Sequence, residues 1–163
     1  MFILQDRFSG KPVSFSAIEG CKIPLFEEHM NPHGVLFGSR ILELVSSYAA
    51  QVALAHSGVA CRTAGIDFVR FFAPAKREDG LVCKAAINHC WENSMEVGVR
   101  VVAEDFRSLE QKHVLSAYFT YEALDAEGRI LVVPKLILEN EEQKRRFSDA
   151  ERRRLLRIKR LGK

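Results

Sequence analysis

The residues of this 163-residue chain that could act in catalysis gather around one stretch, residues 31–57. It opens on a turn-forming Asn-Pro-His-Gly run at Asn31, and Gly38 follows where a helix is expected to begin. Its single acidic residue is Glu43, and Ser46 lies three positions later. A carboxylate can activate a water molecule or attack a carbonyl, and free N–H groups at a helix start can stabilise an oxyanion. The stretch therefore has groups that could act on a carbonyl compound.

The same stretch is predicted to form a long helix, because apolar residues cover nearly every side of its helical wheel. About 20 residues at a rise of 1.5 Å would make a rod of roughly 30 Å. Arg40, Glu43 and Gln51 interrupt the apolar run, which argues against a membrane span. We therefore expect a buried central helix that ends at Gly58.

Segments with strand-like patterns surround this helix. One lies within residues 15–26, four follow at 59–72, 81–88, 95–102 and 113–124, and a short extension covers 130–134. Short turns join the later strands, so these are expected to be antiparallel neighbours. Gly65 and Gly98, inside strands, are expected to help the sheet curve. The prediction for residues 1–138 is an α+β domain in which a five-stranded antiparallel sheet wraps around the helix.

Positive charge is concentrated near the C-terminus. Residues 139–163 carry ten Lys/Arg and five Asp/Glu, whereas residues 1–138 carry fourteen and sixteen. This segment is predicted as a basic helical arm that docks by one narrow apolar stripe, and the spacing of Ser148 and Glu151 indicates that its helix restarts there. Acids alternate with the bases, and the sheet lacks an interleaved aromatic and basic surface, so nucleic-acid binding is not favoured.

The four cysteines, Cys21, Cys61, Cys83 and Cys90, show no C-x-x-C spacing. Neither a metal site nor a disulfide scaffold is expected from them, and reduced thiols fit a cytosolic protein. Residues 1–8 lack the basic start and the long apolar run of a signal peptide. These features predict a cytoplasmic protein without a membrane anchor.

Three segments resemble the hotdog-fold acyl-CoA thioesterases, in particular the cytosolic acyl-CoA thioester hydrolase group. Residues 31–38 match the N-x-x-G-x-x-F-G entry to the family's central helix, residues 93–99 its S-M-E-V strand start, and residues 142–154 its charged tail. The resemblance implies hydrolysis of acyl-CoA to free CoA and a fatty acid, without a metal or an organic cofactor. It also implies a homodimer whose two sheets join, with hexamers formed as trimers of dimers and active sites at the subunit interface.

The resemblance also assigns catalytic roles. The oxyanion would be held by backbone N–H groups around Gly38, and Asn31 would bond the thioester carbonyl or the water. The family places Asp or Glu nine residues after the Phe of its F-G pair, where this chain has Ser46. We expect Glu43 to substitute for that carboxylate, the alternative being a solvated Glu43 paired with Arg40.

The phosphates of CoA require positive charge and backbone donors. The residues that match CoA-contacting positions of the family are Ala64, Gly65, Ile66, Asn93, Ser94, Met95 and Arg154.

Two other functions remain open on the sequence. Because Ser46 replaces the usual carboxylate, the chain could bind acyl-CoA with weak or no hydrolysis. A hotdog dehydratase would need a catalytic histidine, and the helix offers only His56 at its far end. The acyl-chain length that the protein prefers is not fixed by the sequence.

Overall fold

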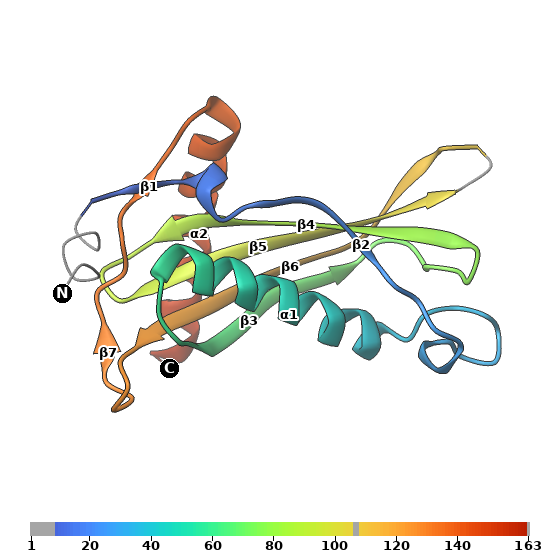
Figure 1. Cartoon of the computed structure of the whole chain (residues 1–163), viewed down its shortest axis with the longest axis horizontal. Helices are drawn as coiled ribbons and strands as arrows, with labels where there is room; N and C mark the ends of the chain where they lie inside the picture. The colour runs from blue at the N-terminus through green and yellow to red at the C-terminus, as the bar shows by residue number, and fades with distance from the viewer. Residues whose placement is uncertain (1–8, 106–107, 163) are drawn as a thin grey trace.

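In this computed structural model, which describes residues 9–105 and 108–162, the helix α1 (Gly38–Ser57) lies across one face of an antiparallel sheet (Figure 1). The strand order is β2-β4-β5-β6-β3. The strands are β2 (Ile18–Ile23), β3 (Cys61–Phe71), β4 (Asp79–Cys90), β5 (Ser94–Asp105) and β6 (Gln111–Leu124). The predicted hotdog arrangement, a five-stranded antiparallel sheet wrapped around a long helix, is confirmed.

Smaller elements complete the description. The short strand β7 (Ile130–Leu131) pairs with β6, and β1 (Lys11–Pro12) pairs with β8 (Leu136–Ile137) in a separate two-stranded sheet. Two 3₁₀ turns, η1 (Val13–Phe15) and η2 (Glu27–His29), flank β2. Residues 1–8 lie outside the described part of the chain, so the expectation that they form no signal peptide stays a prediction.

The core forms where the two-residue repeat of the strands meets the apolar face of α1. Alternate strand residues turn one face of the sheet toward the helix, and each of them is at most 3% exposed: Leu81, Cys83, Ala85, Ile87, Met95, Val97, Val99, Val101, Leu115, Ala117, Phe119 and Tyr121. The buried apolar residues of α1 recur at helical spacing, and these are Ile41, Val45, Ala49, Val52 and Ala53. The sheet residues lie in the segments 81–88, 95–102 and 113–124, which the sequence predicted as strands.

The prediction that α1 is enclosed on every side is wrong for the single chain. Phe37, at its start, is 45% exposed and Leu54, near its end, is 51% exposed. The strand β3 lies at the edge of the sheet and also exposes large apolar side chains, including those of Ile66, Phe68 and Phe71. An open strand edge with exposed apolar side chains is typical of a surface that pairs with another chain.

The strand order also differs from the sequence prediction at β3, which pairs with β6 and not with β4. A connection of seven residues, 72–78, joins β3 to β4. Strands lie about 4.8 Å apart, so the connection must cover about 14 Å, which seven extended residues can reach. It passes the start of α1, where the Leu36 N–H donates to the Ala75 carbonyl at 2.9 Å. A short connection therefore does not make these two strands neighbours.

The second helix, α2 (Glu141–Leu161), packs on the sheet face opposite α1 (Figure 1). It is continuous, so the predicted restart at Ser148 is wrong, and its single cap is Asn140, whose side chain accepts a hydrogen bond from the Gln143 N–H. It docks through arginine–carboxylate pairs and stacked aromatic rings, where the sequence predicted an apolar stripe. Within the described chain, no helix has both the length and the apolar character needed to cross a membrane.

The two strand glycines have different roles. Gly65 lies at a register shift between β3 and β6, as expected for a bend, but the β4–β5 register is regular at Gly98. A Cβ atom at Gly98 would lie 2.4 Å from Nδ2 of Asn88, which donates a hydrogen bond to the buried Glu96 at 3.1 Å. Gly98 is therefore required for close packing of the outer sheet face.

We expect Gly98→Ala to lower the free energy of unfolding by about 1–3 kcal/mol, because the Asn88 amide must move away from Glu96. Urea unfolding at a fixed protein concentration measures this change. Gly20→Ala is the matched control, since its Cβ would make an ordinary 3.5 Å contact with Val82. Equal free energies for the two variants would contradict the packing role of Gly98.

Candidate active site

The start of α1 offers two free backbone donors. The Arg40 and Ile41 N–H groups both donate to the Phe37 carbonyl, at 3.0 and 3.1 Å. Within residues 9–105 and 108–162, the N–H groups of Gly38 and Ser39 have no hydrogen-bond partner. The first N–H groups of a helix attract negative charge. The predicted oxyanion-binding position around Gly38 therefore has its donors available.

An apolar cavity of about 380 Å³ lies beside these donors. It is bounded by α1, by the end of β3 and by the connection that follows, and its lining includes Leu36, Ile41, Phe71, Phe72 and Val114. A Cβ atom at Gly38 would lie 3.1 Å from Cζ of Phe71, so only glycine leaves this contact relaxed. A ligand whose carbonyl binds at the helix start could thus place an attached apolar chain in the cavity.

Asn31 supports the loop that leads into α1. Its Oδ1 accepts hydrogen bonds from the N–H groups of His33 and Val35, at 2.9 and 3.0 Å. Gly34 completes the turn with a φ of +69°. The Asn31 amide nitrogen has no partner among the described residues, so one donor remains for a ligand. The turn role is visible in the structure, and the role in carbonyl binding stays a prediction.

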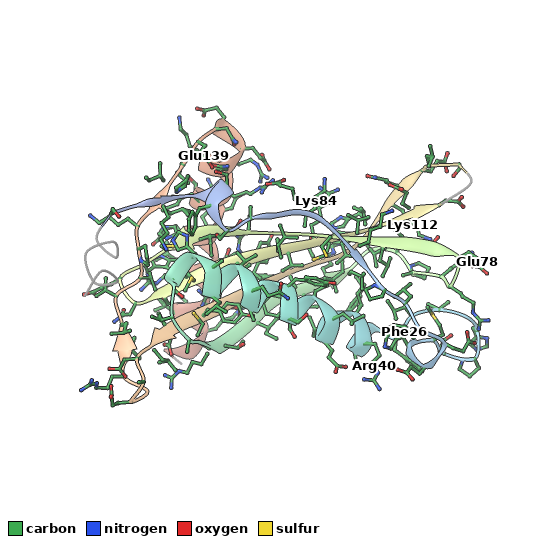
Figure 2. All side chains as sticks on the ribbon, in the orientation of Figure 1. Phe26, Arg40, Glu78, Lys84, Lys112 and Glu139 are labelled. Carbon is green, nitrogen blue, oxygen red and sulfur yellow. The ribbon has the colours of Figure 1, made fainter. Side chains whose placement is uncertain are left out.

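Glu43 lies on the exposed side of α1. Its Oε2 is 2.8 Å from Nη1 of Arg40, and 67% of its side chain is exposed. Figure 2 shows Arg40 pointing outward from the first turns of the helix. The ion pair weighed from the sequence is therefore present, and the predicted catalytic role of Glu43 stays a prediction.

Ser46 stands one turn after Glu43 and is half-buried. Its hydroxyl donates to the Glu43 carbonyl at 2.7 Å, and the hydroxyl of Ser47 donates to the Leu44 carbonyl at the same distance. Neither hydroxyl contacts a histidine within the described chain. The two serines therefore lack the base that would make them nucleophiles.

A tyrosine links Ser46 to the edge strand. The Tyr121 hydroxyl donates to the Ser46 carbonyl at 3.2 Å, and Thr63 of β3 is its register partner in the sheet. Burial raises the pKa of Tyr121, and a hydrogen bond with the Thr63 side chain offsets part of this change. Thr63 was not singled out from the sequence, because a threonine in a β-branched strand carries no catalytic signal by itself.

The predicted CoA-binding residues come together at one end of the sheet. Ala64, Gly65 and Ile66 lie on β3, whose outer edge has no strand partner among the described residues. Asn93 is exposed in the β4–β5 turn, and Ser94 begins β5. The start of β5 and the start of β3 are close, because Glu122 of β6 is the register partner of both Ser94 and Arg62.

Met95 and Arg154 differ in what they can offer a ligand. The Met95 side chain is fully buried in the core, so it cannot contact a ligand at the surface. The Arg154 guanidinium lies 4.7 Å from the centre of the Trp91 ring, and it has no acidic partner in the described chain. Arg154 therefore presents a free positive charge beside the β4–β5 turn.

The Gly38 donors and the predicted CoA-binding segment of one chain lie at different positions along β3. Gly38 is beside Phe71, the last residue of β3, whereas Ala64–Ile66 lie five to seven residues earlier on the strand. At about 3.3 Å per residue, this places the two groups roughly 17–23 Å apart along the strand. One chain by itself therefore does not bring the two groups into a single site.

The other candidate groups do not join this site. His56 is buried at the far end of α1, its Nε2 lies 3.1 Å from the Pro134 carbonyl oxygen, and burial lowers its pKa. It is roughly 27 Å along the helix from Gly38 at 1.5 Å per residue. All four cysteines are free thiols. In the described ranges, no three His, Cys, Asp or Glu side chains are grouped so that they could hold a metal ion.

Comparisons with a family model and with known sequences agree on one family. The model of the family described as Thioesterase superfamily matches residues 33–109. An acetyl-coenzyme A thioesterase of Rattus norvegicus and a cytosolic acyl coenzyme A thioester hydrolase of Homo sapiens are each 32% identical over 80% of this chain. The chain spans only 24% and 35% of the lengths of these two relatives.

Solved structures are similar over nearly the whole chain. An acyl-CoA hydrolase from Bacillus cereus has a TM-score of 0.89 at 30% identity and covers 94% of this chain and 93% of its own. An apo-hexameric acyl-CoA thioesterase has a TM-score of 0.90 at 30% identity, with coverages of 94% and 98%. An acyl-CoA hydrolase from Staphylococcus aureus, in complex with butyryl coenzyme A, coenzyme A and coenzyme A disulfide, has a TM-score of 0.84 at 29% identity, with coverages of 93% and 94%.

The Staphylococcus aureus hydrolase has also been solved as three variants, in which an Asn, an Asp or a Thr is replaced by Ala. Those three positions are separated by 15 and 17 residues. Asn31, Ser46 and Thr63 are separated by the same two intervals in this chain. Ser46 thus stands where the interval places an aspartate, and Thr63 could have been found from this spacing alone.

Proposed function

This chain belongs to the thioesterase superfamily and, within it, to the hotdog-fold acyl-CoA thioesterases, and we propose that it hydrolyses acyl-CoA to free CoA and a fatty acid. One observation carries the proposal. The free N–H groups of Gly38 and Ser39 lie beside an apolar cavity, so a thioester carbonyl and its acyl chain have adjacent places. The match to acyl-CoA hydrolases over more than nine-tenths of the chain supports it.

In the proposed reaction, a water oxygen attacks the thioester carbon and loses a proton to the Glu43 carboxylate. The Gly38 and Ser39 N–H groups stabilise the oxyanion that forms on the carbonyl oxygen. Collapse of the tetrahedral intermediate breaks the C–S bond, the CoA thiolate leaves and takes up a proton, and the carboxylic acid is released. Asn31 would donate from its amide nitrogen to the carbonyl or to the water. No metal and no organic cofactor takes part in this proposal.

We propose that the working unit is a homodimer formed through β3. Its open edge and exposed apolar side chains support pairing with a second copy. Two antiparallel copies of β3 related by a two-fold axis would bring the Phe71 end of one chain, where Gly38 lies, toward the Ala64–Ile66 segment of its partner. The two halves of the site, separated within one chain, would then meet across the interface.

Further assembly and location are proposals of the same kind. Hexamers built as trimers of dimers are supported by a similar structure that is described as hexameric. A cytoplasmic location is supported by the description of the human relative as cytosolic. Neither nucleic acid nor a membrane is among the proposed partners.

The alternative function is acyl-CoA binding with weak or no hydrolysis. Two observations favour it: Ser46 occupies the position of the usual carboxylate, and Glu43 is already paired with Arg40. Incubation with a panel of acyl-CoA thioesters, with detection of released thiol and of the melting temperature, separates the two functions. We expect thiol release. A higher melting temperature with acyl-CoA, without any released thiol, would establish the binder.

A further inference from the structure

The helix α2 crosses the outer sheet face as a strap from β4 to the edge strand β3. Near its start, the Phe147 ring stacks on His89 of β4, with centroids 3.7 Å apart. Arg153 then pairs with Glu96 of β5, and Arg157 pairs with Asp67 of β3. The helix therefore connects the edge strand β3 with β5 and with β4, which is next to the other edge strand β2.

The Arg153–Glu96 pair is enclosed. Glu96 is 0% exposed as a residue, and its Oε1 accepts from Nη2 of Arg153 at 2.6 Å. The Nε of Arg153 is 3.2 Å from both carboxylate oxygens, and its guanidinium lies 3.7 Å from the centre of the Tyr118 ring. Glu96 directly follows Met95, so this pair fixes the end of the predicted CoA-binding segment 93–95.

The Arg157–Asp67 pair holds the other segment. Nη1 of Arg157 donates to Oδ2 of Asp67 at 2.5 Å, and the two side chains are 18% and 26% exposed. Asp67 directly follows Ile66, the last residue of the predicted CoA-binding segment on β3. The strand is irregular here, with a register shift after Asp67 and a φ of +50° at Phe68. β3 is paired with β6 on one side only, so this ion pair adds a constraint where the pairing is irregular.

The arginines of this part of α2 divide into two kinds. Arg153 and Arg157 are paired with carboxylates of the sheet, whereas Arg154 between them has no acidic partner in the described chain. A docked arginine has little capacity left for a ligand, and a free one is available to phosphate. This contrast separates arginines that fix the site from an arginine that could contact CoA.

We propose that Arg153 and Arg157 are positioning residues, which act through Glu96 and Asp67 to hold both CoA-binding segments and Arg154 in one arrangement. The inference rests on the proposed function, because it concerns how that site recognises the nucleotide part of CoA. Fixed donors bind a flexible ligand more tightly, because less ordering is required when the ligand binds.

The test changes each member of the Arg157–Asp67 pair, which is more exposed than the Arg153–Glu96 pair. We expect Arg157→Met and Asp67→Asn each to weaken CoA binding about tenfold, measured by calorimetry on the full chain. The aspartate variant is the more decisive one. Loss of a negative charge near the CoA phosphates would by itself strengthen binding, so weaker binding shows that Asp67 acts by positioning. Unchanged or tighter binding by Asp67→Asn would overturn the proposal.

A second readout separates positioning from damage to the fold. In both variants, KM for an acyl-CoA should rise about tenfold with little change in kcat, whereas kinetics with the matching S-acyl pantetheine, which lacks the nucleotide, should not change. An equal loss for both substrates would overturn the proposal. Arg157→Lys should recover part of the affinity. Arg152→Met is the matched control, because the Arg152 side chain is 78% exposed and its one acidic partner among residues 9–105 and 108–162 is Asp149 on the same helix.

Failure of this inference is distinguishable from failure of the proposed function. CoA binding is measured without hydrolysis, so wild-type protein that binds CoA but releases no thiol refutes the hydrolase and leaves the positioning test intact. Wild-type protein that releases thiol, with Asp67→Asn binding CoA as tightly as wild type, refutes the positioning and leaves the hydrolase intact.

Discussion

Replacing Glu43 by Gln should lower kcat for acyl-CoA by about 10²–10⁴-fold, the range typical of a lost general base, with little change in KM. The amide keeps the size of the side chain and its place on the surface of α1, but it cannot accept the proton of the attacking water. Steady-state kinetics with one acyl-CoA measures the effect. Unchanged turnover would exclude Glu43 from the mechanism.

Arg40→Met is the matched control for Glu43→Gln. It removes the ion pair at 2.8 Å but leaves the carboxylate in place. Because both side chains are at least half exposed, the pair contributes little to stability. We expect kcat of this variant to stay within about threefold of wild type. A loss as large as that of Glu43→Gln would show that the ion pair matters, and that the carboxylate is not the base.

Arg153→Met should produce the largest loss of stability, about 3–5 kcal/mol in the free energy of unfolding. It would leave the Glu96 carboxylate buried, with the Asn88 amide as its remaining hydrogen-bond donor in the described chain. For a chain of this size the melting temperature should fall by roughly 6–20 °C. Thermal unfolding at one fixed protein concentration measures this, because assembly also affects the melting temperature.

The double variant Glu96→Gln with Arg153→Met tests the cause of that loss. It removes both charges, and Gln can still accept the hydrogen bond from Asn88. We expect it to recover most of the lost stability, because no uncompensated charge remains buried. If the double variant were as unstable as Arg153→Met alone, the lost stability would come mainly from packing of the arginine over Tyr118. The buried charge would then not be its cause.

Features set by neighbouring residues were predictable. The alternation of Leu81, Cys83, Ala85 and Ile87 predicted a strand with one buried face, and all four are buried. Gly58 ends α1 with a φ of +71°, a conformation that glycine adopts without strain. These features depend on short sequence windows, where the period of apolar residues decides the structure.

Features set by distant contacts were not predictable in the same way. The position of β3 beside β6 depends on how the sheet closes around α1, and nothing in residues 59–72 specifies it. The docking of α2 depends on Glu96, which lies 57 positions before its partner Arg153 in a strand that otherwise reads as an ordinary alternating segment. The sequence therefore predicted an arm docked by an apolar stripe, whereas the helix is held by one ion pair with a buried carboxylate and by a second, partly exposed ion pair.

The candidate site was predictable only through the family resemblance. Asn31 and Gly38 follow from a motif at the helix start, and the structure places them in a loop and beside a cavity that suit those roles. Thr63 was missed, because its signal is an interval to Asn31 and Ser46 that becomes visible only beside a related chain.

The most direct test of thioester hydrolysis is a time course that quantifies free CoA and free fatty acid released from one acyl-CoA by the wild-type protein. Hydrolysis at the start of α1 predicts equal amounts of both products and many turnovers per chain. No release, or release of CoA that stops at one equivalent per chain, would contradict it.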